Sequence, residues 1–491
     1  MAWLNKYKPE VRAEVPELEA VFERGNEIGD LAMGLFGDFV EVTTYTDDKL
    51  DIAAMITRTQ EELAKGTENI CEASFSYMGN YCAVDILRKE GDGYAIYEVK
   101  SSTKTREDED VDSPEVKAVY VADIAYQKYV LEHCGIKVTG TYLITLNKDY
   151  VRGEDLDIHE LFLVTNVANL VKDEIQLVEP NLKLADKILN SNEEPEKNLA
   201  KRCRDPYGCQ FWSYCTKDLP EKSVFDLYRM RFSKKLDLYG RGIVEYTDLL
   251  ACGDVKNKTQ IRQMEFAVEE KDTYADADNI RDFLDELYYP LYFLDFETMM
   301  PAIPLFQGTK PYQQIPFQYS LHYIEKEGGE LKHREFLGVS GEDPRRAIAE
   351  ALCRDIPMNV CTTAYNKSFE CTRLRELAET FPDLSEHLLN IRDHIVDLLV
   401  PFRSGYYYNR AMGGSFSIKS VLPAIYPDAP ELNYHNLEGV HNGGEAMNIF
   451  PKIQYMEPAD REKARQNLLK YCELDTYAMV KVWQELVRVI N

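Results

Sequence analysis

One short stretch constrains the fold more than any other: "FLDFETMM", residues 293–300, is an apolar run that contains two acids. Asp295 and Glu297 are two residues apart, so in a β-strand their side chains share one face, with Phe296 on the other. A carboxylate is costly to bury unless something neutralises its charge. The stretch therefore predicts a buried strand whose two acids require a cation or another partner.

Length and composition indicate several globular domains. The chain has 491 residues, which predicts about two to four domains. Charged residues make up 29% and hydrophobic residues 45%, and no apolar run approaches the roughly 18 residues of a membrane span. The start, "MAWLNKYKPE", lacks the apolar core of a secretory signal, and eleven cysteines without a small-domain framework are typical of a reducing compartment. We expect a soluble, cytoplasmic protein.

The charge balance limits the mode of any nucleic-acid binding. A net charge of −27 disfavours indiscriminate binding to a polyphosphate but allows a local basic groove. Residues 222–241 hold six Lys or Arg against two Asp. A solvated helix face explains this segment equally well, so both interpretations stay open.

The N-terminal part mixes strand-like and helical patterns. The β-rich runs 81–87 and 94–100 are joined by "RKEGDG", whose Asp-Gly pair favours a hairpin turn. A helical pattern covers 119–135 and a further strand 139–146, and the acidic stretch 106–115 reads as a loop.

The predicted hairpin places three ionisable side chains together. Asp85 lies on its first strand, and Glu98 and Lys100 share a face of its second. An Asp and a Glu can hold Mg²⁺, and a lysine beside them can position water or offset phosphate charge. The hairpin is therefore a candidate metal-dependent catalytic site.

The C-terminal part contains further acids beside apolar structure. Glu370 follows Asn366 by four residues, so if both belong to one helix their side chains would be neighbours on the same face. Asp397 follows the apolar pair Ile395 and Val396. Tyr471 and Asp475 continue at helical spacing into an apolar face formed by Met479, Val482 and Leu486. Strands followed by helices predict an α/β or α+β domain here.

Together these acids predict a hydrolytic metal site. Enzymes that cut phosphodiesters often hold two Mg²⁺ or Mn²⁺ ions about 4 Å apart. One ion activates the attacking water and the other stabilises the leaving oxygen. Tyr471 would orient or deprotonate that water. The alternative is that each acid is salt-bridged or lies at a strand edge.

Three motifs carry a resemblance. "DFE" at 295–297, "NKSFE" at 366–370 and "YCELD" at 471–475 resemble the ordered motifs of the DEDD 3′–5′ exonucleases of the RNase H-like fold. The resemblance implies catalytic roles for Asp295, Glu297, Glu370, Tyr471 and Asp475, with metal bound by Asp295, Glu297 and Asp475. Glu370 stands where most of that superfamily has Asp. "GGSFSIKSVLPAIYP" (413–427) resembles a YprB-like subgroup that is fused to RecB-type nuclease domains.

The N-terminal hairpin carries a second resemblance. "VDIL…YEVKSST" resembles the core of the PD-(D/E)XK nucleases, especially the RecB-like branch that includes CRISPR-associated exonucleases. This resemblance implies metal binding by Asp85 and Glu98 and catalysis with Lys100, and Gln127 resembles the glutamine of the following helix. Leu131 stands where that helix has a tyrosine, with Tyr129 two positions early. Asn26 and Glu27 replace an early metal-ligating histidine. Glu72 is either an accessory acid or an exposed strand residue.

A cysteine set follows the predicted nuclease region. Cys203, Cys209 and Cys215 are spaced C-x5-C-x5-C. Thiolates grouped in this way suit an iron–sulfur cluster or zinc, and unligated thiols are the alternative. The RecB-like resemblance implies a [4Fe–4S] cluster whose fourth, early cysteine would lie in a front segment missing before Met1. Another cysteine could substitute for it, but none of Cys71, Cys82 and Cys134 matches the expected position.

We therefore predict a multidomain α/β protein in three parts. Residues 1–217 form a RecB-like, restriction-endonuclease-like α/β core, 218–288 a helical connector, and 289–491 an RNase H-like exonuclease domain. The predicted function is metal-dependent hydrolysis of nucleic acid, DNA rather than RNA. The alternatives are an RNA exonuclease, a non-catalytic nucleic-acid-binding subunit of a repair or defence complex, and an iron–sulfur scaffold.

Overall fold

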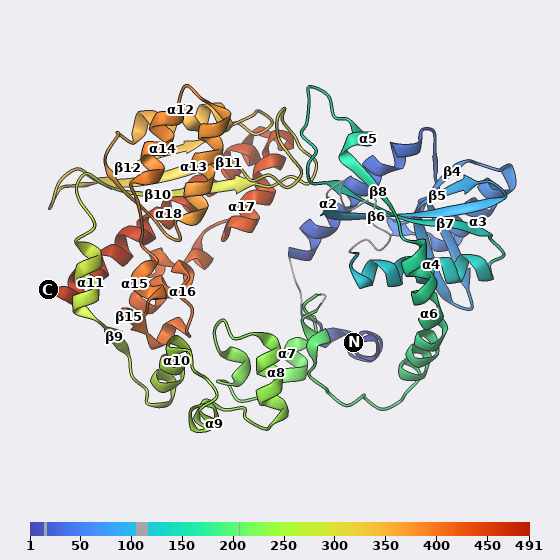
Figure 1. Ribbon diagram of the computed structural model, residues 1–491, viewed down its shortest axis with the longest axis horizontal. Helices are drawn as coiled ribbons and strands as arrows, with labels where there is room; N and C mark the ends of the chain where they lie inside the picture. Colours follow the sequence, from blue (N-terminus) through green and yellow to red (C-terminus); the bar gives the residue numbers. More distant parts are fainter. Residues whose placement is uncertain (14–16, 105–115, 206) are drawn as a thin grey trace. The chain divides into compact units, whose positions relative to one another are not determined.

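The chain is a mixed α/β protein, as predicted (Figure 1). A computed structural model describes residues 1–13, 17–104, 116–205 and 207–491, so the predicted loop at 106–115 lies outside the described residues. The chain divides into two compact units. Unit 1 comprises Met1–Asn198, Arg202–Cys215 and Pro301–Gln313, and unit 2 comprises Leu199–Lys201, Thr216–Met300 and Gln314–Asn491.

Unit 1 is built on a six-stranded sheet in the order β1-β4-β5-β6-β7-β8. The strands are β1 Val40–Glu41, β4 Asn69–Tyr77, β5 Asn80–Glu90, β6 Gly93–Lys104, β7 Val138–Asn147 and β8 Phe162–Asn166. The predicted hairpin is confirmed as β5–β6, because the two strands pair antiparallel up to Glu90 and Gly93. The turn residues are Gly91 and Asp92, one position before the predicted Asp-Gly pair, and Gly91 takes a φ of 61° that suits glycine.

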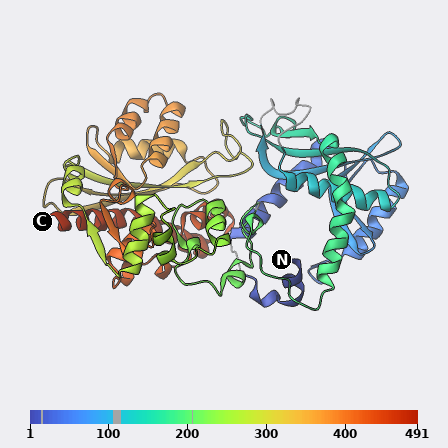
Figure 2. The same ribbon diagram turned by 60° about the horizontal axis from the view of Figure 1, so that its bottom comes forward.

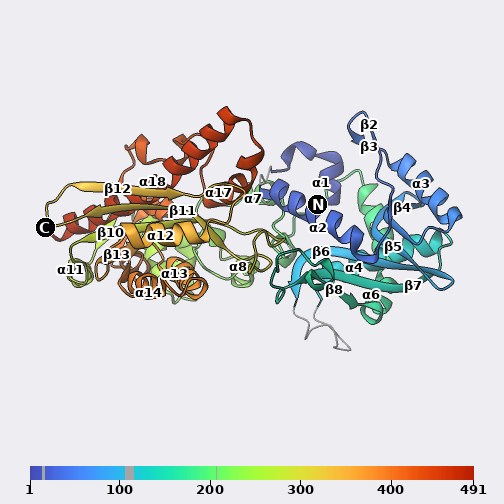
Figure 3. The same ribbon diagram turned by 90° about the horizontal axis from the view of Figure 1, so that it is seen from above.

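Helices cover both faces of this sheet (Figure 3). Helices α4 (Ala118–His133) and α6 (Ala168–Leu189) pack on one face, where Ile124 and Val171 are buried. Helix α2 (Glu17–Met33) covers the other face through Ile28. The predicted helix at 119–135 is therefore confirmed as α4, and Gly135 follows its end with a φ of 84°.

Unit 2 is built on a five-stranded sheet in the order β12-β11-β10-β13-β14. The strands are β10 Leu291–Met299, β11 Ile315–Ile324, β12 Leu331–Leu337, β13 Cys361–Ala364 and β14 Ile395–Asp397. Strands β10, β11 and β12 form an antiparallel meander, and β13 and β14 continue the sheet parallel to β10. The run predicted to be a buried strand is thus the central strand, β10.

Two sets of helices sandwich the unit 2 sheet (Figure 3). Helices α12 (Arg345–Asp355), α13 (Ser368–Thr380) and α14 (Ser385–Asp393) bury an apolar core against one face. The long helix α18 (Pro458–Ile490) lies on β10 and β11 at the other face and runs to the C-terminus (Figure 2). The face of α18 predicted to point inward, from Tyr471 to Leu486, is buried.

The segment predicted to be a helical connector is mainly helical and belongs to unit 2. It contains α8 Phe232–Gly240, α9 Tyr246–Cys252, α10 Lys258–Val268 and α11 Ala277–Leu284. It also contains β9 (Thr273–Ala275), which pairs with β15 (Tyr407–Asn409). The three-part division of the chain therefore stays a prediction.

Most of the remaining helices and strands are short, and α3 is the exception. They are α1 Ala2–Tyr7, β2 Tyr45–Thr46, β3 Lys49–Leu50, α3 Ile52–Lys65, α5 Ile158–Leu161, α7 Trp212–Thr216, α15 Val400–Arg403, α16 Ile418–Ile425 and α17 Gly443–Ile449. Within the described parts of the chain, none of the helices combines the length and the apolar character needed to cross a bilayer.

Candidate metal and catalytic sites

Strand β10 presents two acids to helix α18. Phe296 points to the opposite face and packs edge-on against Tyr319 in the core beneath α12, α13 and α14. On the α18 side, ligand atoms of Asp295, Glu297 and Cys472 lie within 4.8 Å of one another. Asp295 and Glu297 therefore lie on one face of β10 and Phe296 on the other, as the two-residue periodicity of a strand predicts.

Helix α18 supplies the third carboxylate. Asp475 is 8% exposed, and its Oδ1 accepts a 2.7 Å hydrogen bond from Tyr434 Oη. One turn earlier, Tyr471 Oη accepts a 3.0 Å hydrogen bond from Lys419 Nζ of α16. Residues from β10, α16 and α18 thus converge on one pocket of unit 2, which we call the β10–α18 site.

Burial and mutual repulsion raise the pKa values of these acids. Burial holds the pKa of Asp295 and of Glu297 well above its usual range, and the charge of Asp475 adds to both shifts. Burial also raises the pKa of Asp475 to about 6, although Tyr434 and Lys419 act in the opposite direction. A divalent cation bound among the three carboxylates would offset both the cost of burying their charges and their mutual repulsion.

Glu370 lies at the beginning of α13 and belongs to the same electrostatic neighbourhood. Burial and the charge of Asp397 raise its pKa to about 8, and Glu370 in turn raises the pKa of Asp295. Its Oε2 is buried and has no hydrogen-bond partner among the described residues. A buried carboxylate oxygen without a partner fits a metal ligand.

The predicted stacking of Asn366 and Glu370 in one helical turn is wrong. Asn366 precedes α13 and has a φ of 72°, in the left-handed region, so it belongs to the turn between β13 and the helix. The carboxylate of Asp397, at the end of β14, accepts a 2.9 Å hydrogen bond from the Asn366 N–H. This bond anchors the turn, and Asp397 therefore has a structural partner.

Cys472 does not replace Asp475 as a ligand for a hard cation. Its burial, together with the charges of Asp295 and Glu297, holds the pKa of the thiol well above its usual range, so the sulfur stays protonated. Mg²⁺ and Mn²⁺ prefer oxygen. The residues that fit the predicted ions are therefore Asp295, Glu297 and Asp475, with Glu370 beside them.

A cavity of about 880 Å³ opens beside the β10–α18 site. Lys419 and Tyr434 line it and also contact Tyr471 and Asp475. His435, His441 and Asn442 add polar groups to its wall. The cavity provides room for a polar substrate next to the carboxylates.

In unit 1 the structure brings together Asp85, Glu98 and Lys100. Asp85 Oδ2 accepts a 2.6 Å hydrogen bond from the Val99 N–H. Lys100 Nζ donates to Glu98 Oε1 at 2.6 Å and to Asp123 Oδ2 of α4 at 2.8 Å. These contacts define the second site, which we call the β5–β6 site.

Gln127 joins this site, as the resemblance implies. Its Nε2 donates a 2.7 Å hydrogen bond to Glu98 Oε2, so both oxygens of Glu98 have protein partners. Burial, followed by the charge of Asp85, raises the pKa of Glu98 to about 8. Burial alone would lower the pKa of Lys100, but Glu98 and Asp123 outweigh it and raise that pKa.

The accessory positions of the β5–β6 site differ from one another. Glu72 is half-buried and has a φ of 58°. Burial raises the pKa of Asp85 to about 7, and the charge of Glu72 adds to this shift. Burial also raises the pKa of Glu72 itself to about 7, so the interpretation as an exposed strand residue is wrong. Asn26 and Glu27 are exposed on α2.

The three late cysteines lie near one another without forming a tight ligand group. The Cys209 N–H donates a 3.0 Å hydrogen bond to the Cys203 carbonyl, and Cys209 and Cys215 pack around Phe211. All three are free thiols, and their sulfurs are absent from the groups of ligand atoms within 4.8 Å in the described chain. Cys71 and Cys82 lie in the cores of the unit 1 sheet, away from this cluster. A metal cluster here stays a prediction.

The basic segment 222–241 is partly offset by neighbouring acids. Arg241 pairs with Asp237 and Asp254, and Lys234 pairs with Asp237. Arg229 instead lies over the Phe416 ring at 4.5 Å. These contacts favour a solvated face for Lys234 and Arg241.

Sequence reasoning assigned no role to Lys419, Tyr434 or Asp123. Lys419 lies inside the quoted 413–427 motif, and Asp123 precedes Gln127 by four residues on α4, so a helical-spacing search would have found Asp123. Tyr434 lies in a short helical turn with no periodic signal.

The chain is similar to proteins of unassigned activity. Residues 292–417 match the family described as "Domain of unknown function (DUF2779)". This match includes Asp295, Glu297 and Glu370 and stops before Lys419 and Asp475.

Curated relatives match part of the chain. An uncharacterized protein of Ureaplasma parvum serovar 3, UU173, is 27% identical over 221 residues, which is 40% of this chain and 31% of the relative. An uncharacterized protein of Mycoplasma genitalium, MG366, is 25% identical over 208 residues, 39% of this chain and 31% of the relative. The match thus spans under a third of the length of these relatives. No solved structure matches the chain significantly.

Proposed function

We propose that unit 2 is a metal-dependent phosphodiesterase of the DEDD exonuclease type, acting on nucleic acid and on DNA in preference to RNA. The observation that carries this proposal is the convergence of Asp295, Glu297 and Asp475 in one buried pocket with raised carboxyl pKa values. Among the residues that the structure describes, none forms a salt bridge with these three acids, and Lys419 hydrogen-bonds Tyr471 instead. A pair of bound divalent ions supplies the Lewis acidity that such hydrolysis requires.

The protein's own groups have distinct roles in this proposal. Asp295, Glu297 and Asp475 hold the ions, and Tyr434 orients Asp475 by donating to Oδ1. Tyr471, one turn before Asp475 on α18, orients or deprotonates the attacking water. Lys419 holds the Tyr471 oxygen and offsets negative charge beside the phosphate position.

A second small cavity supports a nucleic-acid substrate. It has a volume of about 180 Å³, and Tyr228, Arg229, Arg403 and Phe416 are among its lining residues. Arg403 also approaches Asp397 Oδ2 at 3.4 Å. The two guanidinium groups suit phosphates, and such a local basic site is compatible with the overall charge of −27.

For unit 1 we propose a RecB-like nuclease site at Asp85, Glu98 and Lys100. A cavity of about 500 Å³ lined by Lys100, Tyr120 and Asp123 supports access of a substrate. The second candidate is a non-catalytic binding role, which is favoured by one observation: both Glu98 oxygens are already bonded, to Lys100 and Gln127. Manganese calorimetry, with Asp85→Asn compared with the unaltered chain, separates the two candidates, because a non-catalytic unit 1 site binds no metal and the substitution would then leave the number of bound ions unchanged.

Digestion of end-labelled single- and double-stranded DNA and RNA tests the proposal. Wild type, Asp295→Asn and Lys100→Ala are compared with and without EDTA, and Asp460→Asn, in the first turn of α18, serves as the matched control. We expect EDTA to abolish cleavage, Asp295→Asn to remove the unit 2 products, and Asp460→Asn to retain them. Unchanged cleavage by Asp295→Asn, or in EDTA, would refute the assignment to unit 2.

A further inference from the structure

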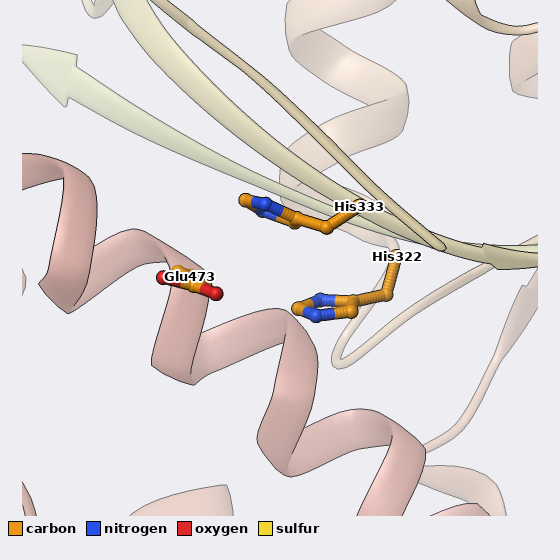
Figure 4. Close-up of side chains that lie close together, drawn as sticks. All are labelled: His322, His333 and Glu473. Atoms are coloured by element: carbon orange, nitrogen blue, oxygen red, sulfur yellow. The ribbon is translucent and has the colours of Figure 1, made fainter. Parts of the chain in front are cut away.

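Two imidazoles and a carboxylate converge at the edge of the unit 2 sheet, outside the β10–α18 site (Figure 4). His322 of β11 and His333 of the edge strand β12 are directly paired across the ladder. Glu473 projects toward them from α18. Ligand atoms of the three residues lie within 4.8 Å of one another.

Hydroxyl groups hold both imidazole rings in place. His322 Nδ1 lies 2.8 Å from Thr476 Oγ1, and His333 Nε2 lies 2.9 Å from Ser320 Oγ. The two hydroxyls are themselves joined at 2.6 Å. Orientation of a histidine through its second ring nitrogen is what ligating histidines require.

The opposite ring nitrogens are available. Among the described residues, neither His322 Nε2 nor His333 Nδ1 has a hydrogen-bond partner, although His322 is only 5% exposed. Glu473 is exposed, and its carboxylate has no ion-pair partner in the described part of the chain. Both nitrogens and the carboxylate can therefore accept a ligand.

We propose that His322, His333 and Glu473 form a binding site for a first-row transition-metal ion, with Zn²⁺ as the best fit. Imidazole nitrogen suits Zn²⁺ better than Mg²⁺, and a His₂Glu set leaves a fourth position for water. Ligands around a tetrahedral ion at about 2.0 Å lie roughly 3.3 Å apart. The three ligand atoms lie within 4.8 Å of one another, so a bound ion would draw the three side chains closer together.

The position of this site gives it a structural consequence. Glu473 lies on α18 between Tyr471 and Asp475, and Ser320 pairs with Asp295 across β10 and β11. A bound ion ties α18 to β11 and β12 immediately beside the β10–α18 site. The ion thus acts as a brace for the helix that carries Asp475, and its binding does not depend on the proposed nuclease activity.

Zinc content tests the proposal directly. The full chain is stripped with a chelator, dialysed against Zn²⁺ and analysed by mass spectrometry for zinc, with thermal unfolding measured on the same samples. His333→Gln and Glu473→Gln are the ligand variants. The matched controls are His387→Gln, whose Nε2 lies 2.8 Å from the Ile356 carbonyl oxygen, and Glu462→Gln, which is exposed on α18.

We expect each ligand variant to hold one zinc ion fewer per chain than the wild type, and to lose the part of the zinc-induced rise in Tm that both controls keep. Zinc bound elsewhere, at the cysteines or at Asp295, contributes equally to all five proteins and cancels in the comparison. Circular dichroism checks folding, which the exposed Glu473→Gln substitution should not disturb. Equal zinc content in the wild type and both ligand variants would overturn the proposal.

Discussion

Lys419 Nζ donates a 3.0 Å hydrogen bond to Tyr471 Oη, although the two residues are 52 positions apart in the sequence. The contact places an ammonium group beside a phenol that lies one helical turn before Asp475. The same ammonium lowers the pKa values of Asp295, Glu297 and Asp475 against the stronger effect of burial. Lys419 is thus the positive charge around which the β10–α18 site is organised.

Replacing Lys419 with Met should shift metal binding to higher pH. Without the ammonium, the pKa values of Asp295, Glu297 and Asp475 rise further, so protons compete with the ion over a wider range. Calorimetric titration with Mn²⁺ at several pH values measures this shift. Lys470→Met, an exposed change on α18, should keep the wild-type profile. An unaltered profile in the Lys419 variant would contradict the electrostatic role.

Tyr471→Phe should slow cleavage while leaving metal affinity nearly unchanged. The phenol orients or deprotonates water and does not ligate the ion, so its loss should reduce kcat by about 10²- to 10⁴-fold, the usual contribution of a positioned acid–base group. Single-turnover digestion together with Mn²⁺ calorimetry measures both quantities. A large loss of Mn²⁺ affinity would instead identify Tyr471 as part of the metal-binding set.

The metal-free protein should lose stability as pH rises. The folded-state pKa values of Asp475 and Glu370 are raised to about 6 and about 8, so the folded protein binds more protons than the unfolded one above about pH 4. Stability from these groups is therefore present at low pH and declines as pH rises toward 8. Thermal unfolding in EDTA between pH 5 and pH 8, at about one-unit steps, measures the decline.

Two comparisons make this pH prediction specific. Mn²⁺ should restore most of the lost stability at the upper end of the range, because it binds the ionised carboxylates. Asp475→Asn should flatten the pH dependence in EDTA, since it removes one of the titrating groups. A metal-free wild type that gains stability with rising pH would show that these carboxyls are ionised at little cost.

Lys100→Met should reduce cleavage by unit 1 without unfolding the protein. Glu98 loses its ammonium partner, but its pKa is already about 8, so it can take up a proton and keep the hydrogen bond from Gln127. Digestion in an Asp295→Asn background isolates the unit 1 products, and circular dichroism checks the fold. Lys89→Met, exposed on β5, is the matched control. Full activity in the Lys100 variant would favour the non-catalytic role of unit 1.

Local patterns were sufficient for several parts of the β10–α18 site. Strand alternation correctly placed Asp295 and Glu297 opposite Phe296, and the helical spacing of Tyr471 and Asp475 correctly predicted a buried face of α18. Each of these features depends on residues within one element, whose periodicity is a property of the backbone. The α/β class followed in the same way from the succession of elements.

Contacts between distant elements were decided only by the tertiary structure. Lys419 reaches Tyr471 and Tyr434 reaches Asp475 because the packing of α18 against β10 brings four separate segments to one pocket. The packing of α18 against the sheet also brings Glu473 close to His322. The sequence by itself determined which side chains share a face of a strand or helix, since that is set by short-range geometry. Which faces meet depends on long-range packing, which no local period encodes.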